Sequence, residues 1–255
     1  MSAESRIGFD RTVRSEWLDA AVASVLRGES PETTRKFLWD FLEGVELGTT
    51  NNSGRGKTLT VLTRIWVSVP VEVGPLRDVA LKCIRSASSE QRICVHWAMT
   101  AATHRFFFDV ASSVGRLLKL HGSANRSQIK RRMTDAWGDR STLERTIQHV
   151  LRSLGQWGLL RTGPEHGSLV GPTKRIQVNE EFSQLFLHAV LLAQGRAGSF
   201  SQLTDHPALF AFALNLSRDS LSENPLFQVH RQGDQSELIE LRHPRSGPLK
   251  WMAVA

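Results

Sequence analysis

The sequence has few of the features that mark secreted, metal-binding or membrane-spanning proteins. It holds two cysteines, Cys83 and Cys94, in 255 residues. Two thiols cannot form a disulfide framework and are too few for a zinc site unless histidines join them, so we expect both to be buried thiols. The apolar run from Leu185 to Ala193 is interrupted by His188 and falls short of the roughly 18 residues that suggest a membrane span. The N-terminal stretch MSAESRIGFDRTVRSEW lacks the apolar core of a secretory signal, which predicts a soluble, cytoplasmic protein.

Motifs of the common catalytic sites are also missing. Neither the Gly-x-Ser-x-Gly turn of α/β-hydrolases nor the His-Glu-x-x-His helix of zinc proteases occurs in the chain. His96, His104 and His121 lie near Cys94 but lack the compact spacing of zinc ligands, so we expect them to be core or surface residues. We therefore expect a protein that is not an enzyme and has no cofactor or metal.

The stretch NNSGRGKT, residues 51–58, ends like a nucleotide-binding P-loop. A P-loop needs Gly, four free residues and Gly-Lys-[Ser/Thr], because its amides wrap around phosphate oxygens. Asn51 stands where the first glycine should be, and the preceding pattern predicts a helix instead of the buried strand of a real P-loop. We therefore interpret residues 48–57 as a basic loop in which Arg55 and Lys57 contact DNA phosphates.

Positive charge is concentrated in the middle of the chain. The net charge is +7 overall, and the basic and acidic residues counted by segment give −3 for residues 1–50, +6 for 51–120, +6 for 121–176 and −2 for 177–255. Clustered positive charge favours polyanions, since each phosphate that is neutralised releases condensed counterions. The alternative is a well-solvated surface without a ligand.

The first half of the chain has the periodicity of helices. Apolar residues recur at spacings of three and four from Trp17 to Leu26 and from Phe37 to Leu42, with Ser30 as N-cap and Pro31 at the first helical position between them. We expect a further helix that ends before Pro70, another opened by Pro75, and one or two more that reach Leu120. No internal repeat is evident.

Three short helices and a hairpin are predicted in the stretch 108–178. The second helix places Ile129, Met133 and Trp137 on one face, and Ser141 with Glu144 has the spacing of a capping box at the start of the third. After the ending WGLL, a loop rich in glycine and proline leads to a returning strand at Ile176–Val178. This order resembles a winged helix-turn-helix DNA-binding domain.

That resemblance implies a set of DNA-contacting residues. The third helix of a winged helix enters the major groove, and its outward face is predicted to carry Thr142, Arg145, His149 and Arg152. Phosphate contacts are expected from Lys130, Arg131 and Arg132 on the preceding helix and from Lys174 and Arg175 at the base of the wing, with Arg126 and Arg140 as weaker members. A solvated helix face is the alternative.

The predicted fold class is therefore mainly α. A helical bundle (residues 1–105) precedes the winged helix-turn-helix domain (106–179) and a small C-terminal α/β-hairpin section (180–255), with helices at 179–194 and 205–217 and two strands joined at QGDQ.

The chain as a whole resembles the BrxA family of accessory proteins of BREX phage-defence systems. The stretches that carry the resemblance are RIWVSVP, HWAMTAATHRFFFDVASSVGRLLKL and RSLGQWGLL. It implies a bacterial protein that binds double-stranded DNA beside other defence-system proteins. A scaffold that docks a protein partner through the winged helix, and an RNA-binding protein, are the alternatives.

Overall fold

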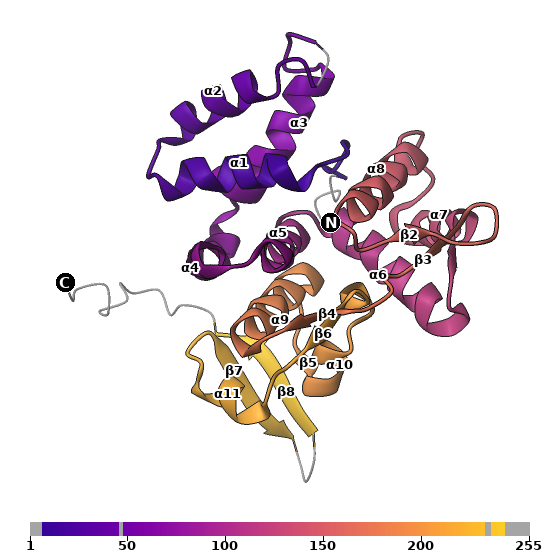
Figure 1. The fold of residues 1–255 in the computed structure, drawn as a ribbon. Helices are drawn as coiled ribbons and strands as arrows, with labels where there is room; N and C mark the ends of the chain where they lie inside the picture. Colours follow the sequence, from indigo (N-terminus) through magenta and orange to yellow (C-terminus); the bar gives the residue numbers. More distant parts are fainter. Residues whose placement is uncertain (1–6, 46–47, 233–235, 243–255) are drawn as a thin grey trace.

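The computed structural model describes residues 7–45, 48–232 and 236–242. Helices make up 61% and strands 11% of the structure, which confirms the prediction of a mainly α protein. An N-terminal helical part, a central unit and a C-terminal unit surround helix α5 (Ser89–Thr103) (Figure 1). Helix α5 contacts helices from each of these parts, so one continuous core extends through the molecule.

The N-terminal part is helical throughout, as predicted. Ser30 caps the second helix by accepting a hydrogen bond from the amide of Thr33 at 3.1 Å, and Ser88 forms a capping box with Gln91 at the start of α5. Cys83 and Cys94 are buried free thiols, and burial raises the pKa of each to about 12. The elements that precede α5 are α1 (Ser15–Leu26), α2 (Pro31–Phe41), α3 (Gly54–Leu62), the π-helix η1 (Thr63–Val67), the 3-10 helix η2 (Val71–Val73) and α4 (Gly74–Ser86).

The prediction of a loop over residues 48–57 is wrong for its last part, because α3 already begins at Gly54. The Ser53 hydroxyl accepts a hydrogen bond from the amide of Gly56 and caps this helix. A Cβ at Gly56 would lie 2.4 Å from the carbonyl oxygen of Asn51. The second glycine of the P-loop-like run is therefore required by packing of the helix start against its own loop.

The central unit consists of α6 (Arg105–His121), α7 (Arg126–Trp137), α8 (Leu143–Gln156) and the short strands β1 (Ala124–Asn125), β2 (Arg161–Thr162) and β3 (Ser168–Val170). The three strands form an antiparallel sheet in the order β1-β3-β2. Ile129, Met133 and Trp137 are buried on one face of α7, as predicted.

Two local predictions for this unit are wrong. The returning strand of the hairpin is β3, whereas residues Ile176–Val178 form β4 and pair in parallel with β6 (Phe212–Leu214) of the next unit. The predicted capping box at Ser141 and Glu144 is also absent, because Thr142 is the N-cap residue without a side-chain hydrogen bond. The Glu144 carboxylate instead accepts a hydrogen bond from Lys130 at 2.6 Å.

The C-terminal unit begins with the predicted helix α9 (Glu180–Gln194). The next predicted helix, at 205–217, is wrong, since this stretch forms the 3-10 helix η3 (Pro207–Leu209) and strand β6. The two predicted tail strands are confirmed as β7 (Phe227–Gln232) and β8 (Ser236–Leu241), and residues 233–235 of their connection lie outside the described residues. Strand β5 (Gly198–Ser199), helix α10 (Phe200–Thr204) and helix α11 (Arg218–Glu223) complete the unit.

The central and C-terminal units repeat one arrangement of elements. In each, a long helix ends at a left-handed glycine, Gly122 or Gly195, and a two-residue strand then leads into a helix capped by Asn125 or Ser199. A further helix and a hairpin follow, directly in the central unit and after η3 and β6 in the C-terminal unit, and the sheets have the same antiparallel order, β1-β3-β2 and β5-β8-β7. The chain therefore carries two copies of one structural unit.

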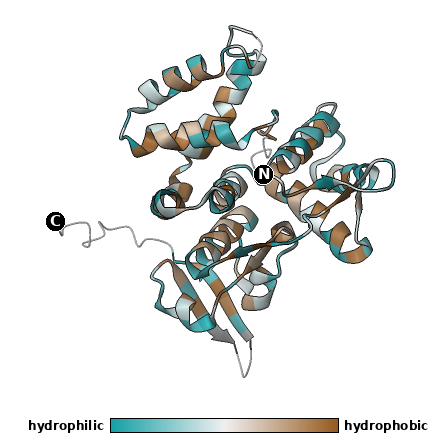
Figure 2. Ribbon diagram, in the orientation of Figure 1, coloured by the Kyte–Doolittle hydropathy of each residue, from teal (hydrophilic) through white to brown (hydrophobic). Residues whose placement is uncertain are grey.

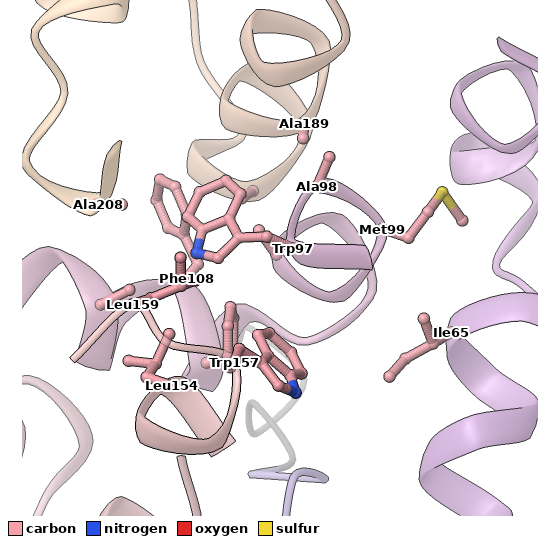
Figure 3. Packing of buried hydrophobic residues seen from close by; sticks show 14 of the residues in the cluster. Ile65, Trp97, Ala98, Met99, Phe108, Leu154, Trp157, Leu159, Ala189 and Ala208 are labelled. Carbon is pink, nitrogen blue, oxygen red and sulfur yellow. The ribbon is translucent and has the colours of Figure 1, made fainter. Parts of the chain in front are cut away.

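The aromatic side chains at the centre join the parts of the molecule. The ring of Trp97 on α5 packs against Phe107 of α6, Phe186 of α9 and Phe212 of β6, with centroid distances of 6.2, 5.2 and 5.6 Å. Figure 3 shows Trp97 among buried residues of other elements, with Phe108 of α6 and Trp157, which follows α8, close by. The second copy of the unit is thus packed on the same core as the first.

Candidate nucleic-acid interface

Helix α8 has one buried face and one exposed face. Figure 2 shows that hydrophilic and hydrophobic residues are both present along this helix. Leu143, Ile147, Val150 and Leu154 are buried. Thr142, Arg145 and Arg152 are exposed, as predicted. Gln148 is exposed between the two arginines, so the side chains at 145, 148 and 152 form one stripe along the helix.

His149 does not belong to this stripe, which corrects its predicted place on the outward face. Its side chain is only 9% exposed, and its Nδ1 lies 3.0 Å from Oγ1 of Thr12. Burial, followed by the charges of Arg11, Arg145 and Arg152, lowers the pKa of His149. The imidazole therefore stays neutral and holds the N-terminal segment, instead of contacting a ligand.

The segment before α1 packs along α8. The amide of Val13 donates to Oγ of Ser153 at 2.8 Å, and Nε1 of Trp157 donates to the carbonyl oxygen of Val13 at 3.0 Å. Phe9 packs on Phe107 with a centroid distance of 5.4 Å. This docking places Arg11 beside the exposed arginines of α8, a neighbour that no local sequence pattern indicates.

A cleft of about 390 Å³ opens between α8, the β2–β3 hairpin and the start of α7. Three arginines line it, one from each of these elements, and none of its lining residues is acidic. Its small apolar surface comes from three nearly buried leucines, Leu151, Leu160 and Leu169. The lining residues are Arg126, Gln148, Leu151, Arg152, Gly155, Leu160, Arg161, Thr162 and Leu169.

The predicted phosphate contacts on α7 and after β3 are surface residues with different surroundings. Lys130 forms a 2.6 Å ion pair with Glu144, whose hydrogen bond raises the lysine pKa, whereas Arg131 is exposed and Arg132 is half-buried. Lys174 and Arg175 are exposed on the connection between β3 and β4. Arg175 also donates to the carbonyl oxygen of Phe212, which ties it to the C-terminal unit.

Arg55 and Lys57 have separate roles. The guanidinium of Arg55 lies 4.2 Å from the ring centroid of Trp39 and donates to the carbonyl oxygen of the same residue at 2.6 Å. Its side chain is 7% exposed, so Arg55 is a structural residue and its predicted place on a phosphate-binding surface is wrong. Lys57 is 44% exposed and lies 3.9 Å from Asp10, beside the segment that packs on α8.

The two copies of the unit differ in charge. Residues 105–178 contain thirteen basic and five acidic residues, whereas residues 180–242 contain four basic and eight acidic ones. The position of Arg126 at the start of α7 corresponds to Phe200 at the start of α10. The positive surface is therefore a property of the central copy and not of the shared architecture.

Within residues 7–45, 48–232 and 236–242, no cluster of three or more His, Cys, Asp or Glu side chains could hold a metal ion. In the same ranges no single helix is long and apolar enough to cross a membrane, although the bent pair 54–67 and 71–86 reaches that length and composition together. Residues 1–6 of the stretch considered for a secretory signal lie outside the described residues.

Comparison of the chain with protein-family models, with curated proteins and with solved structures gives no match.

Proposed function

We propose that the protein binds double-stranded DNA through the exposed face of α8 and the adjoining cleft. The observation that carries the proposal is the convergence of five arginines from four separate segments on this face: Arg11, Arg126, Arg145, Arg152 and Arg161. None of the five forms an ion pair with another described residue. Such a set of unpaired guanidinium groups is suited to phosphates and to guanine edges.

The architecture supports the same function. The order of α6, β1, α7, α8, β2 and β3, with a β1-β3-β2 sheet, agrees with the order expected of a winged helix-turn-helix domain and supports that part of the proposal. In this arrangement α8 is the helix that enters the major groove, and the β2–β3 hairpin is the wing that follows the backbone. Arg145, Gln148 and Arg152 would then face the base edges, and Arg126 and Arg161 the phosphates.

Binding of duplex DNA at two salt concentrations tests the proposal. If about five phosphates are neutralised, the logarithm of the association constant should fall with the logarithm of salt concentration with a slope of about −4 to −5. Fluorescence anisotropy with a labelled duplex gives both the affinity and this slope. Absence of binding at low salt would refute DNA binding, and preferential competition by an RNA duplex would favour the RNA-binding alternative.

For the biological setting we propose an accessory role in a bacterial BREX-like phage-defence system. The resemblance of the sequence to the BrxA family is its support. Deletion of the gene from a bacterium that carries such a system should change the efficiency of phage plating, and re-expression should restore it. A variant with Arg145→Ala and Arg152→Ala should fail to restore it if the role depends on DNA binding.

A further inference from the structure

The cleft beside α8 has the composition of a site for a small anion with a polar part. Arg126, Arg152 and Arg161 surround a volume of about 390 Å³, which lies within the usual range of small-molecule pockets. Gln148 and Thr162 add polar side chains, whereas Leu151, Leu160 and Leu169 are only 5%, 3% and 4% exposed. A phosphate group and a polar group joined to it could therefore be held together in this cleft.

The guanidinium groups of the cleft are available for a ligand. Arg161 donates from Nε to the carbonyl oxygen of Gly171 at 3.2 Å, which fixes its side chain. Its two terminal nitrogens form no hydrogen bond with another described residue and can contact a ligand. Arg126 occupies the first position of α7, where the positive end of the helix dipole adds to its charge. Three like charges in one cleft repel each other, and an anion bound between them removes that repulsion.

The second copy of the unit shows that the fold does not require this cleft chemistry. At the position of Arg126 it has Phe200, and the guanidinium of Arg218 from α11 lies 5.4 Å from the centroid of that ring. The hairpin of this copy carries a pair between His230 and Glu240, at 2.8 Å. The same architecture thus forms with an aromatic residue at the position of Arg126, so the fold does not require an arginine there.

We infer that the cleft holds a single unpaired nucleotide, with its phosphate on Arg126 and Arg161 and the polar edge of its base toward Gln148, Arg152 and Thr162. Gln148 and Thr162 line the same cleft and can hydrogen-bond the polar edge of a base. A base that is paired and stacked in a duplex cannot enter it, so the nucleotide is either the unpaired end of a DNA strand or a free mononucleotide. The strand-end case rests on the proposed DNA-binding function, whereas the free-nucleotide case does not.

Two binding experiments with the full chain separate these sources. In the first, anisotropy compares a blunt duplex with the same duplex carrying one unpaired, 5′-phosphorylated nucleotide at an end. We expect the unpaired nucleotide to raise affinity about tenfold, which corresponds to about 1.4 kcal/mol and is the size of one good charge-assisted contact. In the second, calorimetry measures binding of dAMP, with deoxyadenosine and inorganic phosphate as partial ligands.

Matched variants locate the effect. Arg161→Ala should abolish the preference for the unpaired end and weaken dAMP binding, because it removes a phosphate partner inside the cleft. Arg145→Ala, on the same face of α8 but outside the lining of the cleft, should weaken both duplexes equally and keep their ratio. Loss of the preference in Arg145→Ala with its retention in Arg161→Ala would overturn the inference.

The possible outcomes distinguish this inference from the proposed function. Equal affinity for the two duplexes, with no dAMP binding at about 10 mM, overturns the nucleotide site while leaving duplex binding intact. Binding of inorganic phosphate as tight as that of dAMP also overturns it, since the base would then contribute nothing. Binding of dAMP without any duplex binding refutes the proposed function and supports the nucleotide site.

Discussion

Oγ1 of Thr12 lies 3.0 Å from Nδ1 of His149, although 137 positions separate the two residues. This contact holds the segment before the first helix against α8, the helix on which the proposed DNA-binding face lies. Two backbone hydrogen bonds of Val13, to Ser153 and Trp157, fix the same segment. The N-terminal segment therefore forms part of the surface around α8 in the central unit.

Arg11 should contribute to DNA affinity because of this docking. We expect Arg11→Ala to weaken duplex binding severalfold, which is the usual effect of removing one phosphate contact, and to reduce the salt slope by about 1. Arg14→Ala is the matched control, since Arg14 is exposed three positions further on and already pairs with Glu16 at 3.7 Å. Anisotropy titrations of the two variants measure the difference. Equal effects of both substitutions would place the DNA away from the N-terminal segment.

Arg145 and Arg152 should contribute more than any residue outside the α8 face. Each substitution to alanine is expected to cost about 1–3 kcal/mol of binding free energy if the side chain makes a bidentate base contact. Arg218→Ala is the control, because Arg218 is an exposed arginine at the start of a helix in the acidic copy of the unit. Unchanged affinity in the Arg145→Ala, Arg152→Ala double variant would contradict the assignment of α8 as the reading helix.

The elements of the central unit were predictable, but their contacts were not. Period-3.6 patterns locate α6, α7 and α8 and separate the buried leucines of α8 from Arg145 and Arg152. The same pattern placed His149 outside, because it contains no information about a segment 137 positions away that covers one edge of the helix. Gln148 was not predicted to belong to the exposed stripe. Because the N-terminal segment covers the side of α8 that carries His149, the exposed stripe runs through Gln148 instead.

The partners of short strands also had to come from the structure. Alternation at Ile176–Val178 correctly indicates a strand, but a three-residue strand gives no information about which neighbour it pairs with, and its partner is β6. The internal repeat leaves only a faint trace in the sequence, NRSQI at 125–129 and SFSQL at 199–203. Ile129 and Leu203 are fully buried at matching positions of the two copies. Five aligned residues are too few to reveal a repeat before the topology is known.

Arg55 and Lys57 should separate stability from DNA binding. Arg55→Ala removes a buried side chain that stacks on Trp39 and hydrogen-bonds its carbonyl oxygen, so we expect a loss of about 2 kcal/mol in the free energy of unfolding. Lys57→Ala should change stability by less than about 0.5 kcal/mol, because its pair with Asp10 is exposed. Denaturant titrations measure both values. A larger loss in Lys57→Ala than in Arg55→Ala would contradict these roles.

Gly115 and Gly155, which both lie inside helices, should respond oppositely to a methyl group. A Cβ at Gly115 would lie 1.8 Å from the carbonyl oxygen of Pro207, so Gly115→Ala should force α6 away from η3 and cost roughly 2–4 kcal/mol of stability. At Gly155 the nearest atom would be 3.7 Å away, and Gly155→Ala should stabilise α8 by up to about 1 kcal/mol. Thermal unfolding of the two variants provides the comparison. Similar melting temperatures would show that α6 and η3 are not in close contact.

Buried histidines should make the fold sensitive to mild acid. Burial, followed by the positive charge of Arg64, lowers the pKa of His104 from 6.5 to about 3. The unfolded chain therefore binds a proton below pH 6.5 that the folded protein excludes, so stability is lost as the pH falls through this range. His104 alone should contribute a loss of about 2 kcal/mol between pH 7 and pH 5.

The substitution His104→Phe removes this titration while keeping an aromatic ring against Phe9, whose centroid lies 5.4 Å away. The variant should therefore lose less stability than the natural protein between pH 7 and pH 5, as measured by urea unfolding at both values. His166→Phe, at an exposed position of the β2–β3 connection, is the control and should lose as much as the natural protein. If His104→Phe shows the full loss, then His104 is protonated in the folded state at pH 5, and its burial is incomplete in solution.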